Sequence, residues 1–181
     1  MNITPGKRLA ILGANGMGKS TLVQIIAGIK LPSEGKILWK ADSKNIEGED
    51  IYRSVSFAAP YMELIEEFTL KEHIRFHFSL KKALGNLNTE AIIELSGMKD
   101  SSDKMVRYFS SGMKQRLRLL LAIISDTPIL ILDEPSTNLD QEAVKWYLNL
   151  IREFSGNRTI IVASNHQLHE YGFCENNFVI E

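Results

Sequence analysis

The sequence predicts an α/β domain whose parallel sheet is interrupted by a block of helices. Short apolar runs without polar alternation occur near both ends of the chain, which is typical of strands buried on both faces of a sheet. Segments with helical spacing separate these runs, and three of them follow one another in the middle of the chain. We therefore expect one domain over residues 1–181, with a core from residues 1–60 and 116–181 and a helical subdomain at about 61–115.

The first third of the chain alternates between strand and helix signals. A buried strand is expected at Arg8–Gly13, and a helix follows in "KSTLVQIIAGI", with Gly28 as its stop. "LPSEG" predicts a turn by its proline and glycine. Aromatic and β-branched residues then predict strands at residues 36–39 ("KILW") and 54–59 ("SVSFAA").

Three helices are expected in the middle of the chain. The first begins at Thr69, which forms a capping box with Glu72. The second covers residues 89–96 and is closed by Gly97, and the third spans about residues 112–125. Because no strand signal lies among these helices, they predict a subdomain inserted into the sheet.

The last third returns to alternating elements. Residues 128–133, "PILILD", form an apolar run that suits a strand buried on both faces. Asp140 is expected to cap a helix that reaches about residue 154. Strands are expected again at residues 159–164, "TIIVAS", and in the final "NFVIE".

Composition excludes several classes of function. The net charge is −1, so the chain lacks the basic excess of a protein dedicated to nucleic acid, and we expect no nucleic-acid partner. Cys174 is the single cysteine, which rules out an internal disulfide and fits a reducing compartment. No apolar run approaches the roughly 18 residues that span a bilayer, and the N-terminus does not resemble a signal peptide.

Residues 13–20, "GANGMGKS", fit the phosphate-loop pattern G-x-x-x-x-G-K-[ST] between an expected strand and an expected helix. Glycines let backbone N–H groups turn toward phosphate oxygens, and the helix N-terminus adds its positive dipole end. Lys19 is expected to reach the β- and γ-phosphates, and the Ser20 hydroxyl is a hard ligand for Mg²⁺. A glycine-rich turn with an accidental lysine is disfavoured by the flanking elements, so the loop predicts binding of a nucleoside triphosphate.

Two acids end the apolar run "ILILDEP". In α/β folds the carboxyl ends of parallel strands face the ligand crevice, so Asp133 suits a contact to Mg²⁺. Glu134 follows it and is placed to orient or deprotonate a water molecule. A solvated turn before a helix is the alternative, which the phosphate loop in the same chain makes less favourable.

Three further motifs complete a set that resembles the nucleotide-binding domain of ATP-binding cassette (ABC) ATPases. These are "FSSGMKQR" upstream of the acid pair, "STNLD" directly after it, and "VASNH" after the next strand. The resemblance covers nearly the whole chain in the right order. It implies a P-loop NTPase (RecA-like) core of the ABC ATPase type with an inserted helical subdomain, short at the N-terminus.

The resemblance also implies roles for individual residues. Asp133 would support Mg²⁺, Glu134 would be the catalytic carboxylate, and His166 would contact the γ-phosphate of ATP. A histidine after a strand is by itself more often structural, so the role of His166 depends on the other motifs. The residues implied to hold the phosphates and magnesium are Gly13, Asn15, Gly16, Gly18, Lys19, Ser20 and Thr21.

A second copy of the subunit is part of the same expectation. Ser110 and Gly112 would touch the γ-phosphate of ATP bound to the other subunit of a head-to-tail dimer, and Asp140 would lie at the subunit contact. A serine that only caps the helix after residue 110 is the alternative.

The chain departs from the family pattern at two places. Pro60 stands where the family has a glutamine, and a proline side chain offers neither a metal ligand nor a water contact, so Tyr61 or Glu63 would have to substitute. The strand and the adenine-stacking aromatic residue that usually precede the phosphate loop are absent. The chain is therefore a truncated product, or base recognition is built in another way.

Other candidates favour structural roles. His73 and His77 lie four residues apart on one expected helix but have no third zinc ligand, and Phe76 and Phe78 beside them suit core packing. The acid run at residues 63–67 is expected to be a solvated face or, less favourably, to lie near a partner.

Together the motifs predict an ATP-hydrolysing, Mg²⁺-dependent subunit of an ABC transporter. It would power transport through a separate transmembrane permease and lie in the cytoplasm against the inner face of the cell membrane. The permease would determine which substrate is transported and in which direction. A soluble ABC switch outside transport and a degenerate ATP-binding module with little hydrolysis are the alternatives. Paired cassettes or coiled-coil arms are common among soluble ABC switches, and this sequence shows one cassette and no heptad run. Pro60 keeps the degenerate module open as an alternative.

Overall fold

The computed structural model describes residues 1–41 and 44–180 and divides the chain into two compact units. The first, which we call the sheet unit, consists of Met1–Phe57, Thr127–Glu134 and the segment from Asn157 onward. The second, the helical unit, consists of Ala58–Asp126 and Pro135–Gly156. The sequence-based division, with a helical subdomain over about residues 61–115, stays a prediction.

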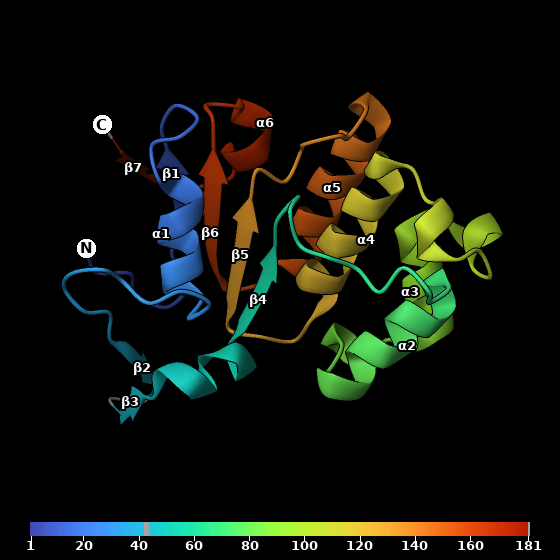
Figure 1. Ribbon diagram of the computed structural model, residues 1–181, viewed down its shortest axis with the longest axis horizontal. Coiled ribbons are helices and arrows are strands. Elements are labelled where there is room, and N and C mark those ends of the chain that lie inside the picture. The colour runs from blue at the N-terminus through green and yellow to red at the C-terminus, as the bar shows by residue number, and fades with distance from the viewer. Residues whose placement is uncertain (42–43, 181) are drawn as a thin grey trace. The chain divides into compact units, whose positions relative to one another are not determined.

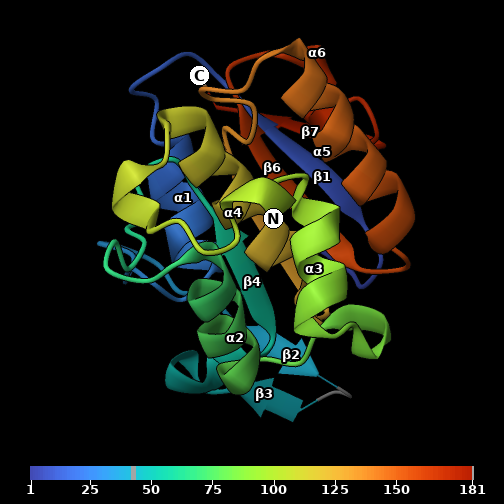
Figure 2. The same ribbon diagram turned by 90° about the vertical axis from the view of Figure 1, so that its right-hand side faces the viewer.

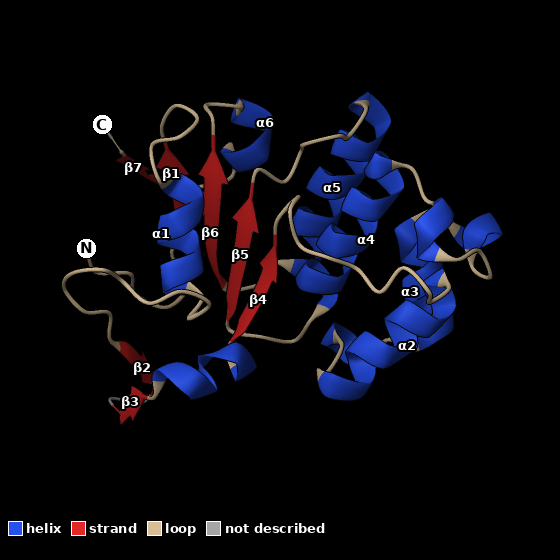
Figure 3. Ribbon diagram, in the orientation of Figure 1, coloured by secondary structure: helices blue, strands red, loops and turns tan. Residues whose placement is uncertain are grey.

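The sheet unit is built on a parallel sheet, as the apolar runs predict. Within the described residues its strands lie in the order β4-β5-β6-β1-β7, and β1 pairs in parallel with both β6 and β7. Figure 3 shows these strands in red, and β4, β5 and β6 point the same way. Their bounds are Arg8–Leu12 (β1), Val55–Ala58 (β4), Ile129–Asp133 (β5), Thr159–Ser164 (β6) and Asn176–Val179 (β7).

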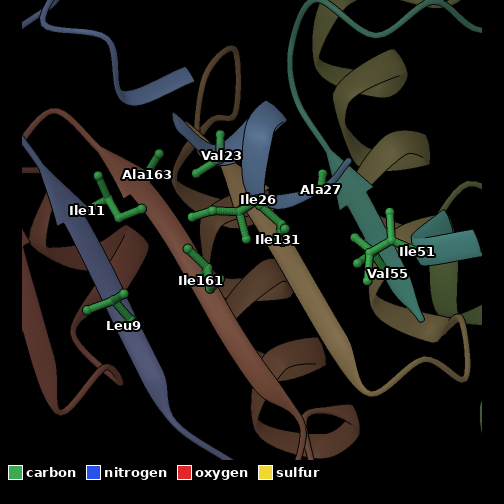
Figure 4. Packing of buried hydrophobic residues seen from close by; sticks show 10 residues of the cluster. All are labelled: Leu9, Ile11, Val23, Ile26, Ala27, Ile51, Val55, Ile131, Ile161 and Ala163. Carbon is green, nitrogen blue, oxygen red and sulfur yellow. The ribbon is translucent and has the colours of Figure 1, made fainter. Parts of the chain in front are cut away.

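Helix α1, Lys19–Ile26, covers one face of this sheet (Figure 1). Val23 and Ile26 point from the helix toward Ile131 of β5 and Ile161 of β6, and all four are buried (Figure 4). Each such side chain contributes about 1.5–3 kcal/mol of transfer free energy when it leaves water. This packing fixes the start of α1, and with it the phosphate loop, against the carboxyl end of the sheet.

The strand predicted at residues 36–39 is wrong. The structure has a small antiparallel pair instead, β2 (Trp39–Ala41) with β3 (Lys44–Ile46). Ile37 and Trp39 pack on the core of the sheet unit, while Leu38 between them is exposed. The alternation in the sequence therefore reflects packing of an irregular segment, which Trp39 anchors by donating its indole N–H to Ile26 O at 2.9 Å.

The helical unit contains α2 (Leu70–Leu80), α3 (Thr89–Ser96), α4 (Ser111–Ile124) and α5 (Gln141–Phe154). Figure 2 shows α2 and α3 of this unit near one another. The capping box is confirmed, since Thr69 Oγ1 accepts from Glu72 N and Glu72 Oε2 accepts from Thr69 N. Gly97 ends α3 with φ at 63°, as expected for a left-handed C-terminal residue.

A set of contacts to Arg116 and Trp146 ties three of these helices together. Trp146 of α5 donates its indole N–H to Leu95 O of α3 at 2.7 Å. Arg116 of α4 lies over the Trp146 ring at 4.7 Å and donates to Ser96 O at 2.9 Å. The N-terminal half of α4 therefore has a fixed place within the helical unit.

Several short helical elements were not predicted from the sequence. They are helix α6 (Leu168–Tyr171) and four 3₁₀ segments at Gly48–Arg53, Leu84–Asn86, Lys99–Ser101 and Val106–Tyr108, counted over the described residues. In the part of the chain that the structure describes, no helix has the length and apolar character needed to cross a membrane.

Candidate nucleotide site

Three predicted motifs follow neighbouring strands of the sheet unit at the same edge. Strand β6 lies between β5 and β1 in parallel register, with Asp133 opposite Ala163 and Leu12 opposite Ser164. The phosphate loop continues from β1, the acid pair ends β5, and His166 follows β6. Because parallel strands present their carboxyl ends at one edge, the sheet brings these three motifs together.

The phosphate loop has the backbone that an anion cradle needs. Gly16 and Gly18 have φ of 84° and 89°, and a Cβ added to either residue would meet no atom within 4 Å. The loop is therefore open on the side that these glycines face. Gly18 precedes α1, and no side chain among the described residues caps that helix. The first-turn N–H groups of α1 are thus available to an anion.

Lys19 and Ser20 begin α1 directly beneath the loop. Lys19 is only 4% exposed, and its Nζ donates to Ala14 O at 3.0 Å, so the ammonium lies against the loop backbone. Ser20 is half-buried, whereas Asn15 and Thr21 are exposed. Gly13 is buried, and a Cβ there would approach Ile180 O to 3.0 Å, which explains why the loop starts with glycine.

The acid pair occupies two different environments. Asp133 is fully buried at the end of β5. Glu134 is half-buried, and its N–H still donates to Ala163 O at 2.9 Å. Its φ of 43° is left-handed, which turns the chain away from the strand direction at this residue.

His166 lies at the tip of a turn that follows β6. The side chain is exposed and the backbone is left-handed, with φ at 56°. Ser164 closes the turn by accepting the Gln167 N–H at 3.1 Å, and its hydroxyl donates to the buried carboxylate of Glu170.

Left-handed backbone marks the predicted motifs. Among the described residues, the non-glycine positions with positive φ are Asn86, Glu134, Asn138 and His166. The last three belong to "DEP", "STNLD" and "SNH". Such conformations cost about 1–3 kcal/mol each and are found most often at functional sites. Their presence in these three motifs therefore favours a functional role for the motifs.

The helical unit holds the second group of predicted residues. Ser110 caps α4 by accepting the Met113 N–H at 3.2 Å, which confirms that it caps the helix. A Cβ on Gly112 would lie 2.9 Å from Asn138 O, so the glycine permits close contact with the "STNLD" loop. Asp140 caps α5, accepting the Ala143 N–H at 2.8 Å.

Gln115 adds a link between α4 and the same loop. Its side chain is fully buried and donates to Pro135 O at 3.1 Å. The structure therefore packs the start of α4 against the segment after the acid pair, within the helical unit.

Pro60 lies in a turn at the start of the helical unit. Met62 N donates to Ala59 O at 3.1 Å across this turn, and Arg118 Nε donates to Met62 O at 2.7 Å. Tyr61 and Glu63 are exposed on either side of Met62.

His73 and His77 make hydrogen bonds within the helical unit. His73 Nε2 accepts the Ile65 N–H at 3.2 Å, and His77 Nε2 lies 2.9 Å from Ser125 Oγ. Burial lowers the pKa of both imidazoles. Within residues 1–41 and 44–180, no group of three metal-ligating side chains comes together.

Two acids of the run are paired at the surface. Glu66 binds Lys114 at 2.5 Å, and Glu67 binds Arg107 at 3.4 Å. The hydrogen bond and charge of Lys114 lower the pKa of Glu66. Surface pairs of this kind contribute little to stability because solvent screens them.

Sequence reasoning missed Ser164, Glu170 and Gln115. A polar residue shows its burial only once neighbouring elements cover it, and no local spacing marks these three. The positive φ at His166 and Asn138 was equally hidden, because neither residue is a glycine.

Comparison with known proteins agrees with the order of the motifs. The family model described as "ABC transporter" matches residues 1–137. The thiamine import ATP-binding protein ThiQ of Haemophilus influenzae (strain 86-028NP) is 30% identical over 186 residues, covering 100% of this chain and 86% of that protein. ATP-binding cassette sub-family A member 17 of Mus musculus is 28% identical, and the match covers 91% of this chain but 10% of that protein.

Solved structures share the fold. A dimeric ATP-binding cassette in a post-hydrolysis state, bound to ADP and Pi, has a TM-score of 0.83 at 20% identity, with 100% of this chain and 84% of that chain covered. The RNase-L Inhibitor has a TM-score of 0.77 at 27% identity, with 98% and 32% covered. Since the family model spans most of the chain and the motifs stand in the matching order, the chain belongs to the ABC transporter family and is an ATP-binding cassette.

Proposed function

We propose that this chain is an Mg²⁺-dependent ATP hydrolase whose site lies at the carboxyl edge of the sheet unit. The observation that carries the proposal is the convergence of the phosphate loop, the acid pair and His166 on three adjacent parallel strands. A triphosphate cradle, a carboxylate and a third polar group at one sheet edge are the parts that phosphoryl transfer to water requires.

The phosphate loop would bind the triphosphate through its backbone and Lys19. Open N–H groups at the start of α1 would face the phosphate oxygens, and the Lys19 ammonium would exchange its bond to Ala14 O for a phosphate. Gly13, Asn15, Gly16, Gly18 and Thr21 complete the cradle. An ammonium already held at the loop would lose little side-chain entropy on binding.

The residues at the sheet edge also fit a magnesium ion. The Ser20 hydroxyl follows the loop and the Asp133 carboxylate ends β5, and both are the hard oxygen donors that Mg²⁺ prefers. When bound, the ion would neutralise charge on the β- and γ-phosphate oxygens.

Glu134 and His166 would act on the reacting atoms. The Glu134 carboxylate would orient the attacking water and accept its proton, since its backbone turns it out of the strand direction. His166 would donate a hydrogen bond to the γ-phosphate from the tip of its turn, so that both groups restrain an in-line attack.

A second copy of the chain would complete the site. Ser110 is exposed and Gly112 is half-buried at the N-terminus of α4, where backbone N–H groups and the helix dipole favour a phosphate. We infer that they contact ATP bound to the other subunit of a head-to-tail dimer, with Asp140 near the subunit contact.

The membrane partner is part of the proposal. ThiQ is a thiamine import ATP-binding protein, and several other relatives are named as transporters. By analogy we propose that this chain powers a separate transmembrane permease and lies in the cytoplasm, peripheral to the inner face of the membrane. We expect no nucleic acid to take part.

The dimer is tested with a Glu134→Gln variant. Without the carboxylate, bound ATP would persist, so the variant is expected to double its mass in size-exclusion chromatography with light scattering when ATP is added. ADP is the control and should leave it monomeric. A variant that stays monomeric with bound ATP would remove the dimer from the proposal.

A degenerate ATP-binding module is the second candidate, because Pro60 stands where the family pattern has a glutamine. Steady-state release of phosphate separates the two candidates. A binding module would hold ATP with the same affinity but release phosphate no faster than the Glu134→Gln variant.

A further inference from the structure

The turn after β6 contains a buried carboxylate that the proposed chemistry does not use. We propose that Glu170 is a positioning residue for His166, acting through the hydroxyl of Ser164. The inference rests on the proposed role of His166 in ATP hydrolysis and assigns the residues that hold it in place.

Ser164 closes the turn that carries His166. It is the last residue of β6 and is fully buried, and its Oγ accepts the Gln167 N–H at 3.1 Å. His166 lies inside this closed loop, with φ at 56°. A histidine rarely adopts this conformation in an open chain, so the closure of the turn sustains it.

Glu170 fixes the direction of the Ser164 hydroxyl. It lies in α6 and is only 2% exposed, although residues 166–169 before it are exposed. Its Oε2 accepts the hydrogen bond that Ser164 Oγ donates, and its own N–H donates to Gln167 O at 2.8 Å. The side chain of Glu170 thus binds Ser164 at the start of the turn, and its backbone N–H binds Gln167 at the end of the turn.

The carboxylate has a specific effect on the hydroxyl. A serine has one proton and two lone pairs, and the proton rotates to the best acceptor. With the proton committed to Glu170, a lone pair remains directed at the Gln167 N–H. Without an acceptor, the hydroxyl would rotate freely, the turn would open more often, and His166 would spend less time in its left-handed conformation.

A packing role is the competing explanation, and it predicts different mutants. If Glu170 only filled space, leucine would serve as well, because its side chain is of similar volume and would keep the turn packed. If the acceptor matters, glutamine would serve, because its amide oxygen can accept the same hydrogen bond.

The experiment measures kcat, ATP affinity and thermal unfolding for Glu170→Leu, Glu170→Gln and His166→Ala. Glu170→Leu is expected to lower kcat about tenfold or more, since small misplacements of a reacting group cost up to about a hundredfold. Its Kd for ATP should change by less than about threefold, because the phosphate loop is untouched. Glu170→Gln should recover kcat to within about threefold of the wild type.

Ser164→Ala keeps the test decisive if the leucine variant does not fold. It removes the hydroxyl and should lower kcat as Glu170→Leu does, and the double variant should be no slower than either single one. Wild-type rates in Glu170→Leu or Ser164→Ala, beside a slow His166→Ala, would overturn the positioning role and leave the proposed function intact. A wild-type rate in His166→Ala would instead contradict the role of His166 itself.

Discussion

His77 shows at the scale of one residue how burial sets chemistry in this protein. His77 Nε2 lies 2.9 Å from Ser125 Oγ, and the Ser125 hydroxyl donates to Leu121 O at 2.7 Å. Burial, with the charges of Lys81 and His73 beside it, lowers the pKa of His77 to about 4. The histidine pair of α2 thus belongs to the stability of the helical unit.

This pKa predicts a loss of stability in mild acid. The unfolded chain takes up a proton near pH 6.5 whereas folded His77 does so near 4, so the free energy of unfolding should fall as the pH drops through that window. The slope of one such group is about 1 kcal/mol per pH unit. Denaturant unfolding between pH 7 and 4 measures it.

A matched pair of variants tests whether His77 causes the dependence of the free energy of unfolding on pH. His77→Gln retains a side chain that can hydrogen-bond with Ser125 but does not titrate, and its stability should depend less on pH over the same range. His169→Gln removes an exposed histidine and should keep the wild-type slope. Equal slopes in His77→Gln and the wild type would refute the assignment.

The N-terminus of helix α4 has a structural role, and we propose a functional one for it as well. Ser110 caps the helix, and Gly112 lies against Asn138 O of the loop after the acid pair. A cap satisfies N–H groups with a side-chain oxygen, and the same N–H groups and dipole favour a phosphate. The structural role and the proposed function therefore coincide at Ser110, and a variant must separate them.

Ser110→Asp separates the two purposes. Aspartate caps helices as well as serine, so the free energy of unfolding should stay within about 1 kcal/mol of the wild type. Its charge would repel the γ-phosphate of ATP on the partner subunit, so hydrolysis should fall at least about tenfold, a barrier increase of about 1.4 kcal/mol. Ser110→Asn, a neutral cap of the same size, is the control and should be more active. A stable and fully active Ser110→Asp would leave Ser110 as a cap alone.

The elements also show where sequence prediction succeeds and fails. Strands β5 and β6 and the helix ends at Thr69, Gly97 and Asp140 follow from local pattern, because apolar runs and short-range hydrogen bonds are properties of neighbours in sequence. The strand predicted at residues 36–39 was misplaced because the apolar alternation there reflects packing on the core, and the strand begins only at Trp39, which pairs with Ile46. The burial of Glu170 could not be predicted from the sequence, because it depends on how α6 packs beside the turn after β6.

At the scale of the whole molecule, the motifs divide between the two units. The phosphate loop, the acid pair and His166 belong to the sheet unit, whereas Ser110, Gly112 and Asp140 belong to the helical unit. The motifs themselves could be predicted from the sequence, because each is a short pattern. The left-handed backbone within three of them could not, because it arises where strands and loops meet.

The central claim is that the chain hydrolyses ATP with Glu134 as the catalytic carboxylate. Steady-state phosphate release from Mg²⁺-ATP, measured for the wild type and Glu134→Gln at equal ATP occupancy, tests it most directly. We predict that the variant binds ATP within about threefold of the wild type and releases phosphate at least about a hundredfold more slowly, as expected for the loss of a general base. Equal rates of phosphate release in the two proteins would contradict the account.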